Sequence, residues 1–272
     1  MEIVDNDKIK SIMYDVSKKN ILPFFRNLKS NQINYKNNKD IVTSIDIEVE
    51  NYLNKTLPQL IKKSNFIGEE LYFKNPSILD NYNKSEYCWT VDPIDGTSNF
   101  VNGKKKFATM IALTFKKNII QSWIYKPLTE DLMYATNKKG TYINGHKVFK
   151  IKNKKIVNST GSISFKYWNK KDQNTIYILK NNFKKINSYG SIGCEYFDIV
   201  LGKRDFTILS KLSPWDHIPG VLLVRESGGA DCHFDKKRYK FNKKCKNLIV
   251  SNSKTLNLEI IKKIEEINHD YK

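Results

Sequence analysis

The chain has few of the features that mark secreted, membrane-spanning or zinc-binding proteins. Its 272 residues include only four scattered cysteines and no CxxC pair, which disfavours zinc and favours reduced thiols in a cytoplasm. These are Cys88, Cys194, Cys232 and Cys245. No apolar run reaches the ~18 residues that span a bilayer. The N-terminal stretch MEIVDNDKIK lacks the apolar core of a signal peptide. We therefore expect a cytoplasmic protein with no membrane partner.

The sequence also lacks internal repeats and low-complexity linkers. With 40% hydrophobic residues it has the composition of a globular protein, and its length suits one large domain or two tightly joined ones. The lysine-rich stretch IKNKK at 151–155 is a reasonable boundary. It predicts an N-terminal α+β part, residues 1–150, and a C-terminal α/β part, residues 151–272.

Acidic residues are scarce relative to basic ones. Lysine and arginine number 47 and aspartate and glutamate 28, so the net charge is 47 − 28 = +19. This balance favours anionic partners, but the lysines form short clusters such as 104–106 and 243–244 rather than one stripe. A nucleic-acid ligand is therefore not the favoured hypothesis. A diffuse positive field can instead steer a small phosphorylated metabolite towards the protein.

Two of the acids lie in the stretch WTVDPIDGTSNF, residues 89–100. Asp92 and Asp95 are three residues apart at the end of an apolar segment, a spacing that often serves only to cap a turn. Pro93 stiffens this turn, which lets the carbonyl of Ile94 act as a further oxygen ligand between the two carboxylates.

Other acids follow other apolar segments, which favours a shared site. Glu69 and Glu70 end FIGEE, Asp46 lies in VTSIDIE, and Asp216 lies in PWDH, immediately before a predicted helix. Carboxylates gathered at one rim of a sheet repel each other and stay ionised together only if a cation neutralises them. Oxygen ligands without a cysteine or histidine cluster select a hard ion such as Mg²⁺.

Two residues after the acid pair add to this predicted site. Gly96 allows the backbone to approach a ligand closely, and Thr97 supplies a hydroxyl beside the metals. Two ions about 3.5–4 Å apart would hold a phosphate oxygen, generate a hydroxide and stabilise a leaving alkoxide.

Hydrophobic periodicity gives a coarse order of elements in the first third. The chain opens with a helix that carries Ile9 and Val16, and Thr43 or Ser44 is the predicted N-cap of the next helix. YCWTVDP predicts a strand that stops at Pro93.

The rest of the chain mixes strands and helices. FATMIALTF and NIIQSWIY predict a hairpin that turns at Lys116–Lys117, and Asn144–Gly145 predicts a second turn. IPGVLLVRESGG predicts a helix that starts near Pro219 and ends at Gly228–Gly229. Isoleucines at 260, 261, 264 and 267 predict a final amphipathic helix.

Three motifs in this order resemble the landmarks of the inositol monophosphatase family, magnesium-dependent and lithium-sensitive phosphatases. They are GEE at 68–70, WTVDPIDGTSNF at 89–100 and WDHIPG at 215–220. Weaker matches are KDIVTSID at 39–46, GTYINGHKV at 140–148 and YGSIGCEYFDIVLGK at 189–203. The resemblance implies a layered α-β-α-β-α sandwich of the inositol monophosphatase / fructose-1,6-bisphosphatase type, an α+β or α/β fold, assembled as a homodimer.

The resemblance also assigns roles to residues. It implies that two or three Mg²⁺ ions are held by Glu69, Asp92, the Ile94 carbonyl, Asp95 and Asp216. Thr97, helped by Glu69 and Asp46, would orient the attacking water. Substrate and phosphate would be bound by Asp95, Gly96, Thr97, Gly190, Ser191, Ile192 and Asp216, although a plain helix cap is as good an interpretation of the Ser191 side chain.

Departures from the family pattern bear on the substrate. Leu209 stands where inositol-specific members carry a glutamate that binds inositol hydroxyls, and Lys211 is nearby. Asn102 stands where many relatives have a histidine, and we expect His217 to be structural and Lys36 to be solvated.

The predicted activity is hydrolysis of a small polyol or sugar phosphate, with inositol 1-phosphate as the default. Histidinol phosphate, fructose 1,6-bisphosphate and adenosine 3′,5′-bisphosphate are alternatives. An RNA- or ribosome-associated regulator on the same fold is the alternative from another class.

Overall fold

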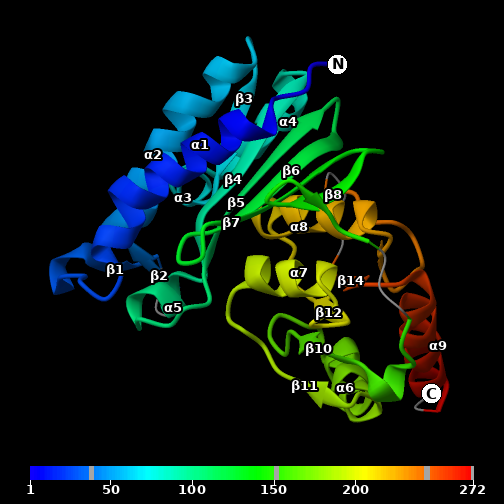
Figure 1. Cartoon of the computed structure of the whole chain (residues 1–272). Helices are drawn as coiled ribbons and strands as arrows, with labels where there is room; N and C mark the ends of the chain where they lie inside the picture. Colours follow the sequence, from blue (N-terminus) through cyan, green and yellow to red (C-terminus); the bar gives the residue numbers. More distant parts are fainter. Residues whose placement is uncertain (37–39, 150–152, 242–245, 271–272) are drawn as a thin grey trace.

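The computed structural model describes residues 1–36, 40–149, 153–241 and 246–270. Helices and sheets alternate in layers (Figure 1). One pair of helices covers the outer face of a seven-stranded sheet, a second pair fills the space between that sheet and a five-stranded sheet, and a third pair covers the far side of the smaller sheet. In this order the pairs are α1 (Asn6–Val16) with α2 (Ser44–Thr56), α7 (Ile192–Val200) with α8 (Pro214–Glu226), and α6 (Lys170–Leu179) with α9 (Lys254–Asp270). The predicted layered fold is confirmed.

The seven-stranded sheet follows the chain from β3 to β9 in order. Only β3 and β4 are parallel, and every later neighbour is antiparallel. The strands are β3 (Asn65–Gly68), β4 (Tyr87–Asp95), β5 (Ala108–Phe115), β6 (Asn118–Lys126), β7 (Asp131–Thr136), β8 (Gly140–Ile143) and β9 (His146–Lys147). Both predicted hairpin turns are confirmed, since Lys116, Lys117, Asn144 and Gly145 all have positive φ, as two-residue turns of type I′ require.

The five-stranded sheet is mixed. Its order is β11-β10-β12-β14-β13; β10 runs parallel to both neighbours, and the pairs on the other side are antiparallel. The strands are β10 (Thr160–Ile163), β11 (Lys185–Ile186), β12 (Phe206–Leu209), β13 (Ala230–Cys232) and β14 (Leu248–Ser251). The shorter elements are β1 (Ile33–Tyr35), β2 (Ile41–Thr43), α3 (Glu69–Lys74), α4 (Asn81–Lys84) and α5 (Thr97–Val101).

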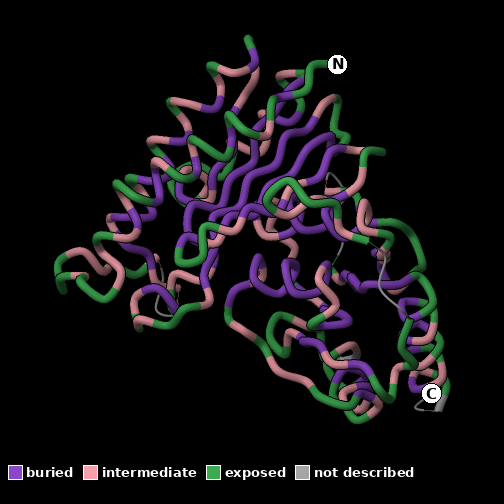
Figure 2. Tube along the Cα trace, viewed as in Figure 1, coloured by how far each residue is buried: buried purple, intermediate pink, exposed green. Residues whose placement is uncertain are grey.

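Burial is concentrated in the strands of the large sheet and in the central helix pair (Figure 2). Helix α8 carries apolar residues around most of its circumference, as expected of a helix buried between two sheets. Gly220 lets α8 approach α7 closely, because a Cβ there would lie 2.0 Å from the ring of Tyr196. This tight central layer fixes the end of α8 that carries Asp216.

The strand β4 does not stop at Pro93, as the sequence analysis expects, but continues to Asp95. Its register with β5 shifts between Asp92 and Asp95, and the Thr109 hydroxyl donates a 2.9 Å hydrogen bond to the Pro93 carbonyl. Proline is tolerated at such an irregularity because no ladder hydrogen bond from its nitrogen is needed there. Both acids are therefore held by a buried strand.

The helix α8 begins at Pro214 rather than near Pro219, so the expected start is wrong. Pro214 suits the first helical position, and Pro219 lies inside the helix at the cost of one backbone hydrogen bond. Packing between the two sheets outweighs that loss. As a result, Asp216 lies in the first turn of α8 instead of immediately before the helix.

The strands divide between the two parts proposed from the sequence. The large sheet uses residues 65–147 and the smaller one residues 160–251, while α7 and α8 from the second part pack against the first sheet. The predicted boundary at 150/151 and the lysines at 243–244 fall outside the described residues. The two parts therefore share the central helical layer.

Two observations concern the expectations about membrane spans and cysteines. Within the described ranges, no helix is long and apolar enough to cross a membrane. Cys88, Cys194 and Cys232 are free thiols, and Cys245 falls outside the described residues.

Candidate active site

Four acids from distant segments lie close enough to β4 for their charges to interact. Asp92 lies on β4, Glu69 begins α3, Asp95 ends β4 and Asp216 lies in the first turn of α8. Burial raises the pKa of Asp92 well above its usual range, and the charges of Glu69, Asp95 and Asp216 each raise it further. The structure thus places the four acids that the sequence analysis predicts as metal ligands within electrostatic range of one another.

Asp92 is repelled by all three of the other acids, and one of its oxygens has no hydrogen bond from the described residues to offset that repulsion. Its carboxylate is buried, and its Oδ1 atom has no hydrogen-bond partner in the described part of the chain. Leaving a buried carboxylate oxygen unpaired is costly unless a positive charge accompanies it. An oxygen-only set around such an atom fits a hard divalent cation.

Glu69 forms an ion pair with Lys36. The Lys36 ammonium lies 2.8 Å from Glu69 Oε1 and 2.6 Å from Glu70 Oε1, and its side chain is only 6% exposed. Burial alone would lower the pKa of Lys36, but the two glutamates outweigh it and raise that pKa. The expectation of a solvated lysine is therefore wrong, because the lysine compensates two acids at the edge of the cluster.

Asp46 and Thr97 form a hydrogen-bonded chain that ends at Ile94. Oδ2 of Asp46 accepts bonds from the amide (2.8 Å) and hydroxyl (2.6 Å) of Thr43, the N-cap residue of α2. The Thr97 hydroxyl lies 2.9 Å from Asp46 Oδ1 and 2.9 Å from the Ile94 carbonyl oxygen. A hydroxyl has one proton, which it donates to one of these two acceptors, so its lone pairs remain for another donor.

Asp95 turns towards the start of α7. It accepts hydrogen bonds from the Ser191 hydroxyl, from the amide of Ile192 (3.0 Å) and from the amide of Gly193 (2.8 Å). Burial raises the pKa of Asp95, and these bonds oppose the rise. A carboxylate at a helix N-terminus is favoured by both the amides and the helix dipole.

Asp216 completes the acid cluster on the α8 side. Burial raises its pKa, with further increases from Glu69 and Asp95, while Lys211 has the opposite effect. Over the described ranges, no three acidic, histidine or cysteine side chains are already grouped closely enough to cage an ion. The acids converge, but Asp95 and Glu69 are each engaged elsewhere, with α7 and with Lys36 respectively.

Gly96 connects β4 to α5 with a backbone that favours glycine. Its φ is +87°, and a Cβ there would lie 3.0 Å from Ser191 Cβ and 3.1 Å from the Gly190 carbonyl. The close approach of these two loops explains why the acid-bearing turn and the start of α7 form one wall.

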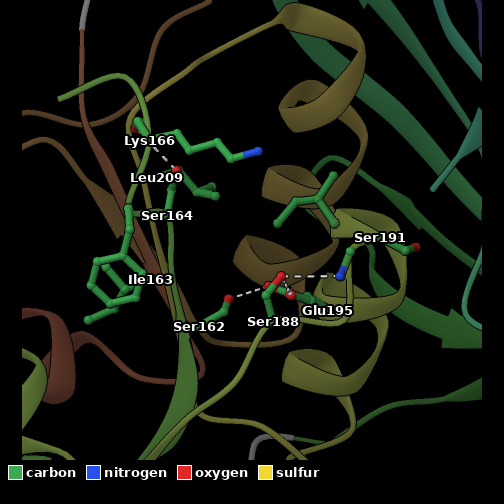
Figure 3. A pocket seen from close by; sticks show the side chains of 11 residues that line it. Ser162, Ile163, Ser164, Lys166, Ser188, Ser191, Glu195 and Leu209 are labelled. Atoms are coloured by element: carbon green, nitrogen blue, oxygen red, sulfur yellow. Dashed lines mark hydrogen bonds between the residues drawn. The ribbon is translucent and has the colours of Figure 1, made fainter. Parts of the chain in front are cut away.

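A cavity of about 430 Å³ adjoins this wall (Figure 3). Gly190, Ser191 and Ile192 line it, together with Leu209 at the end of β12. Ser191 is the N-cap of α7 and accepts a 3.2 Å bond from the Cys194 amide, so the helix-cap interpretation of its side chain is confirmed. The Ile192 amide is bonded to Asp95 in this structure, whereas its predicted partner is substrate.

Two residues that depart from the family sequence pattern, His217 and Asn102, have structural roles. His217 is buried between the Tyr196 hydroxyl (3.1 Å from Nδ1) and the Lys211 carbonyl (2.8 Å from Nε2). A carbonyl only accepts, so Nε2 carries the proton, and burial lowers the pKa of His217 to about 4. Asn102 donates a 2.7 Å bond to the Ser98 carbonyl.

Sequence reasoning missed two buried glutamates that shape the site. Glu50 accepts bonds from the amides of Glu70 (2.8 Å) and Leu71 (2.7 Å), which fixes the start of α3. Glu195 lies on the cavity floor. The available signal was an acid on an otherwise apolar helix face, next to Val49 for Glu50 and within CEYFDIV for Glu195.

Comparisons with known proteins identify the family of the chain. A family model described as the inositol monophosphatase family matches residues 5–269. The inositol monophosphatase of Dictyostelium discoideum is 32% identical over 212 residues, 75% of either chain. The fructose-1,6-bisphosphatase/inositol-1-monophosphatase of Thermotoga maritima is 28% identical over 233 residues, 84% of either chain. A solved Thermotoga maritima IMPase aligns with a TM-score of 0.80 at 24% identity, covering 97% of this chain and 98% of that one. The chain therefore belongs to the inositol monophosphatase family of metal-dependent phosphomonoesterases.

Proposed function

We propose that this protein hydrolyses a small polyol or sugar phosphate with Mg²⁺, and that Asp92 is the central ligand of its metal site. The observation that carries the proposal is the buried, unpartnered oxygen of Asp92, surrounded by three further acids from distant segments. Glu69, the Ile94 carbonyl, Asp95 and Asp216 complete the ligand set for two or three ions. When bound, these ions neutralise the acids and the phosphate and supply an activated water.

The Thr97 hydroxyl is placed to orient the attacking water. Its proton is committed to Asp46 or to the Ile94 carbonyl, so its lone pairs accept a hydrogen bond from that water. Glu69, whose charge acts on Asp92, and Asp46 would help Thr97 to orient that water. Orientation and charge neutralisation are the main sources of catalysis expected for phosphoryl transfer.

Phosphate and substrate would be bound where the turn after β4 meets the start of α7. The amides of Gly96 and Thr97 hold phosphate oxygens, and Gly190, Ser191 and Ile192 contact the leaving group. Asp95 and Asp216 face the same region and accept hydrogen bonds from substrate hydroxyls. The Ile192 amide would become available to substrate once Asp95 binds a cation and no longer accepts the hydrogen bond from that amide.

The default substrate is inositol 1-phosphate, in a cytoplasmic homodimer. The names of the relatives support a choice between inositol phosphate and fructose 1,6-bisphosphate. Leu209 weakens the case for inositol, because an apolar side chain cannot accept a hydrogen bond from a sugar hydroxyl.

The test is a phosphate-release screen with Mg²⁺ over inositol, histidinol, fructose and adenosine phosphates. We expect release from at least one, its loss with a chelator, and its inhibition by lithium. Asp95→Asn should abolish release while the circular dichroism spectrum stays native, and Asp235→Asn, an exposed surface acid, should behave as wild type. Full activity in Asp95→Asn would remove Asp95 from the ligand set, and no release from any substrate would refute the function.

A further inference from the structure

The cavity beside the acid cluster has walls of different chemistry. One side is the end of β10 and the residues after it, and the other side is the start of α7 (Figure 3). The first side consists of Ser162, Ile163, Ser164, Phe165 and Lys166. Isoleucine, phenylalanine and leucine side chains give it apolar surface, and Lys166 and Glu195 are its charged residues. Its ~430 Å³ falls inside the roughly 300–1,000 Å³ of ligand pockets.

The carboxylate of Glu195 already accepts hydrogen bonds from three protein donors. It accepts hydrogen bonds from the hydroxyls of Ser162 and Ser188 (3.0 Å for Ser188) and from the amide of Tyr189 (2.7 Å). Glu195 is 3% exposed. It therefore offers little as an acceptor for substrate hydroxyls, and Leu209 offers nothing.

Unlike that of Glu195, the charged side chain of Lys166 has no partner in the described part of the chain. Within the described ranges its ammonium has no ion pair, and its side chain extends out over the cavity (Figure 3). The backbone that carries it is fixed, since the Ser210 hydroxyl donates to the Lys166 carbonyl and the Trp168 indole donates to the Ser164 carbonyl. The chain thus presents an exposed cation on a fixed backbone, on the wall of the cavity that faces the start of α7.

We propose that Lys166 determines substrate specificity by binding a second anionic group, a phosphate or a carboxylate, at the far end of the substrate. The inference rests on the proposed function, because the first phosphate must occupy the acid cluster. The apolar side chains of Ile163, Ile192 and Leu209 then cover the carbon chain between the two anionic ends. A neutral polyol phosphate would leave Lys166 unused and find few free acceptors.

A matched series of acyclic C6 monophosphate esters and their bisphosphate tests this. Glucitol 6-phosphate has a neutral far end, 6-phosphogluconate a carboxylate, and glucitol 1,6-bisphosphate a phosphate. Initial phosphate release with Mg²⁺ gives kcat/KM for each. We expect at least one anionic-ended substrate to exceed glucitol 6-phosphate by about tenfold or more, the scale of a charge-assisted hydrogen bond. The larger of the two ratios identifies the preferred anion.

Variants then assign the preference to one residue. Lys166→Gln should reduce that ratio by about tenfold and Lys166→Glu should reduce it further, because reversed charge repels the anionic end. Lys170→Gln, at an exposed lysine that begins α6, is the matched control and should keep the wild-type ratio.

The outcomes separate this inference from the function beneath it. Release from glucitol 6-phosphate at an equal or higher kcat/KM, or an unchanged ratio in Lys166→Glu, overturns the role of Lys166 and leaves the phosphatase intact. No release from any phosphate ester, in this series or in the wider screen, overturns both proposals.

Discussion

At the scale of single residues, the Thr97 hydroxyl shows how local geometry sets a chemical role. It lies between two acceptors, Asp46 in the first turn of α2 and the Ile94 carbonyl of β4, and cannot donate its one proton to both. Its proton is therefore directed to one of these acceptors before any substrate arrives, and a lone pair stays available to position a water.

We predict that Thr97→Val lowers kcat by about a hundredfold or more, whereas Thr97→Ser retains most of it, because only serine keeps the oriented hydroxyl. The measurement is steady-state kinetics at saturating Mg²⁺. A valine variant with near wild-type kcat would show that Thr97 has no part in positioning the water.

Asp92 shows the cost of holding a metal ligand in a buried site. Its unpaired oxygen and three acidic neighbours destabilise the metal-free fold, since both burial and repulsion act against its charge. Natural proteins commonly accept such a cost at functional sites.

We predict that Asp92→Asn raises Tm in a chelator by about 2–4 °C, the shift expected for ~1 kcal/mol in a chain of this size. The same variant should lose the rise in Tm that Mg²⁺ gives to the wild type. Thermal unfolding with and without Mg²⁺ checks both. A lower Tm for Asp92→Asn in chelator would contradict the account of an uncompensated charge.

At the scale of elements, Glu50 ties three segments together. It reaches from α2 across the end of β3 to the first amides of α3, so that α3 starts where Glu69 meets the acid cluster. The fit needs glycine before Glu69, because a Cβ at Gly68 would lie 2.2 Å from the Glu50 carboxyl carbon.

We predict that Gly68→Ala destabilises the fold by about 1–3 kcal/mol through this collision and weakens activation by Mg²⁺. Glu50→Ala should also destabilise, because two amides lose their acceptor. In the double variant the added methyl should cost much less, so the two changes are not additive. Urea unfolding of all four proteins measures the coupling, and strict additivity would exclude the steric explanation.

Element boundaries were predictable where local chemistry decides them. The positive-φ turns at Lys116–Lys117 and Asn144–Gly145 and the Thr43 cap follow from short-range rules. Pro93 and Pro219 misled the sequence analysis, because a strand irregularity and a helix buried between two sheets tolerate proline where propensity alone would not. Tertiary packing, absent from any short window, made the difference.

At the scale of the whole molecule, the acidic residues that converge could be predicted but their partners could not. Asp92, Asp95 and Asp216 lie in specific motifs, whereas Lys36 joins Glu69 through a contact between residues 33 apart. No short pattern distinguishes that lysine from the other basic residues of a chain with 47 of them. The same holds for Lys166, whose importance depends on a cavity.

The net charge of +19 gives a prediction for the whole molecule. A positive field attracts phosphorylated substrates over long range and is screened by salt. We expect kcat/KM to fall several-fold between about 50 and 300 mM salt while kcat stays nearly constant. A kcat/KM without salt dependence would exclude steering, and salt-sensitive RNA binding without turnover would favour the regulatory alternative instead.

The most direct test of the central claim is anomalous diffraction from crystals soaked with Mn²⁺, a stand-in for Mg²⁺. The account predicts anomalous peaks within ligand distance of Glu69, Asp92, Asp95 and Asp216, with Asp92 touching the strongest, and their loss in Asp92→Asn. Manganese bound elsewhere, or no peak at a concentration that supports phosphate release, would contradict it.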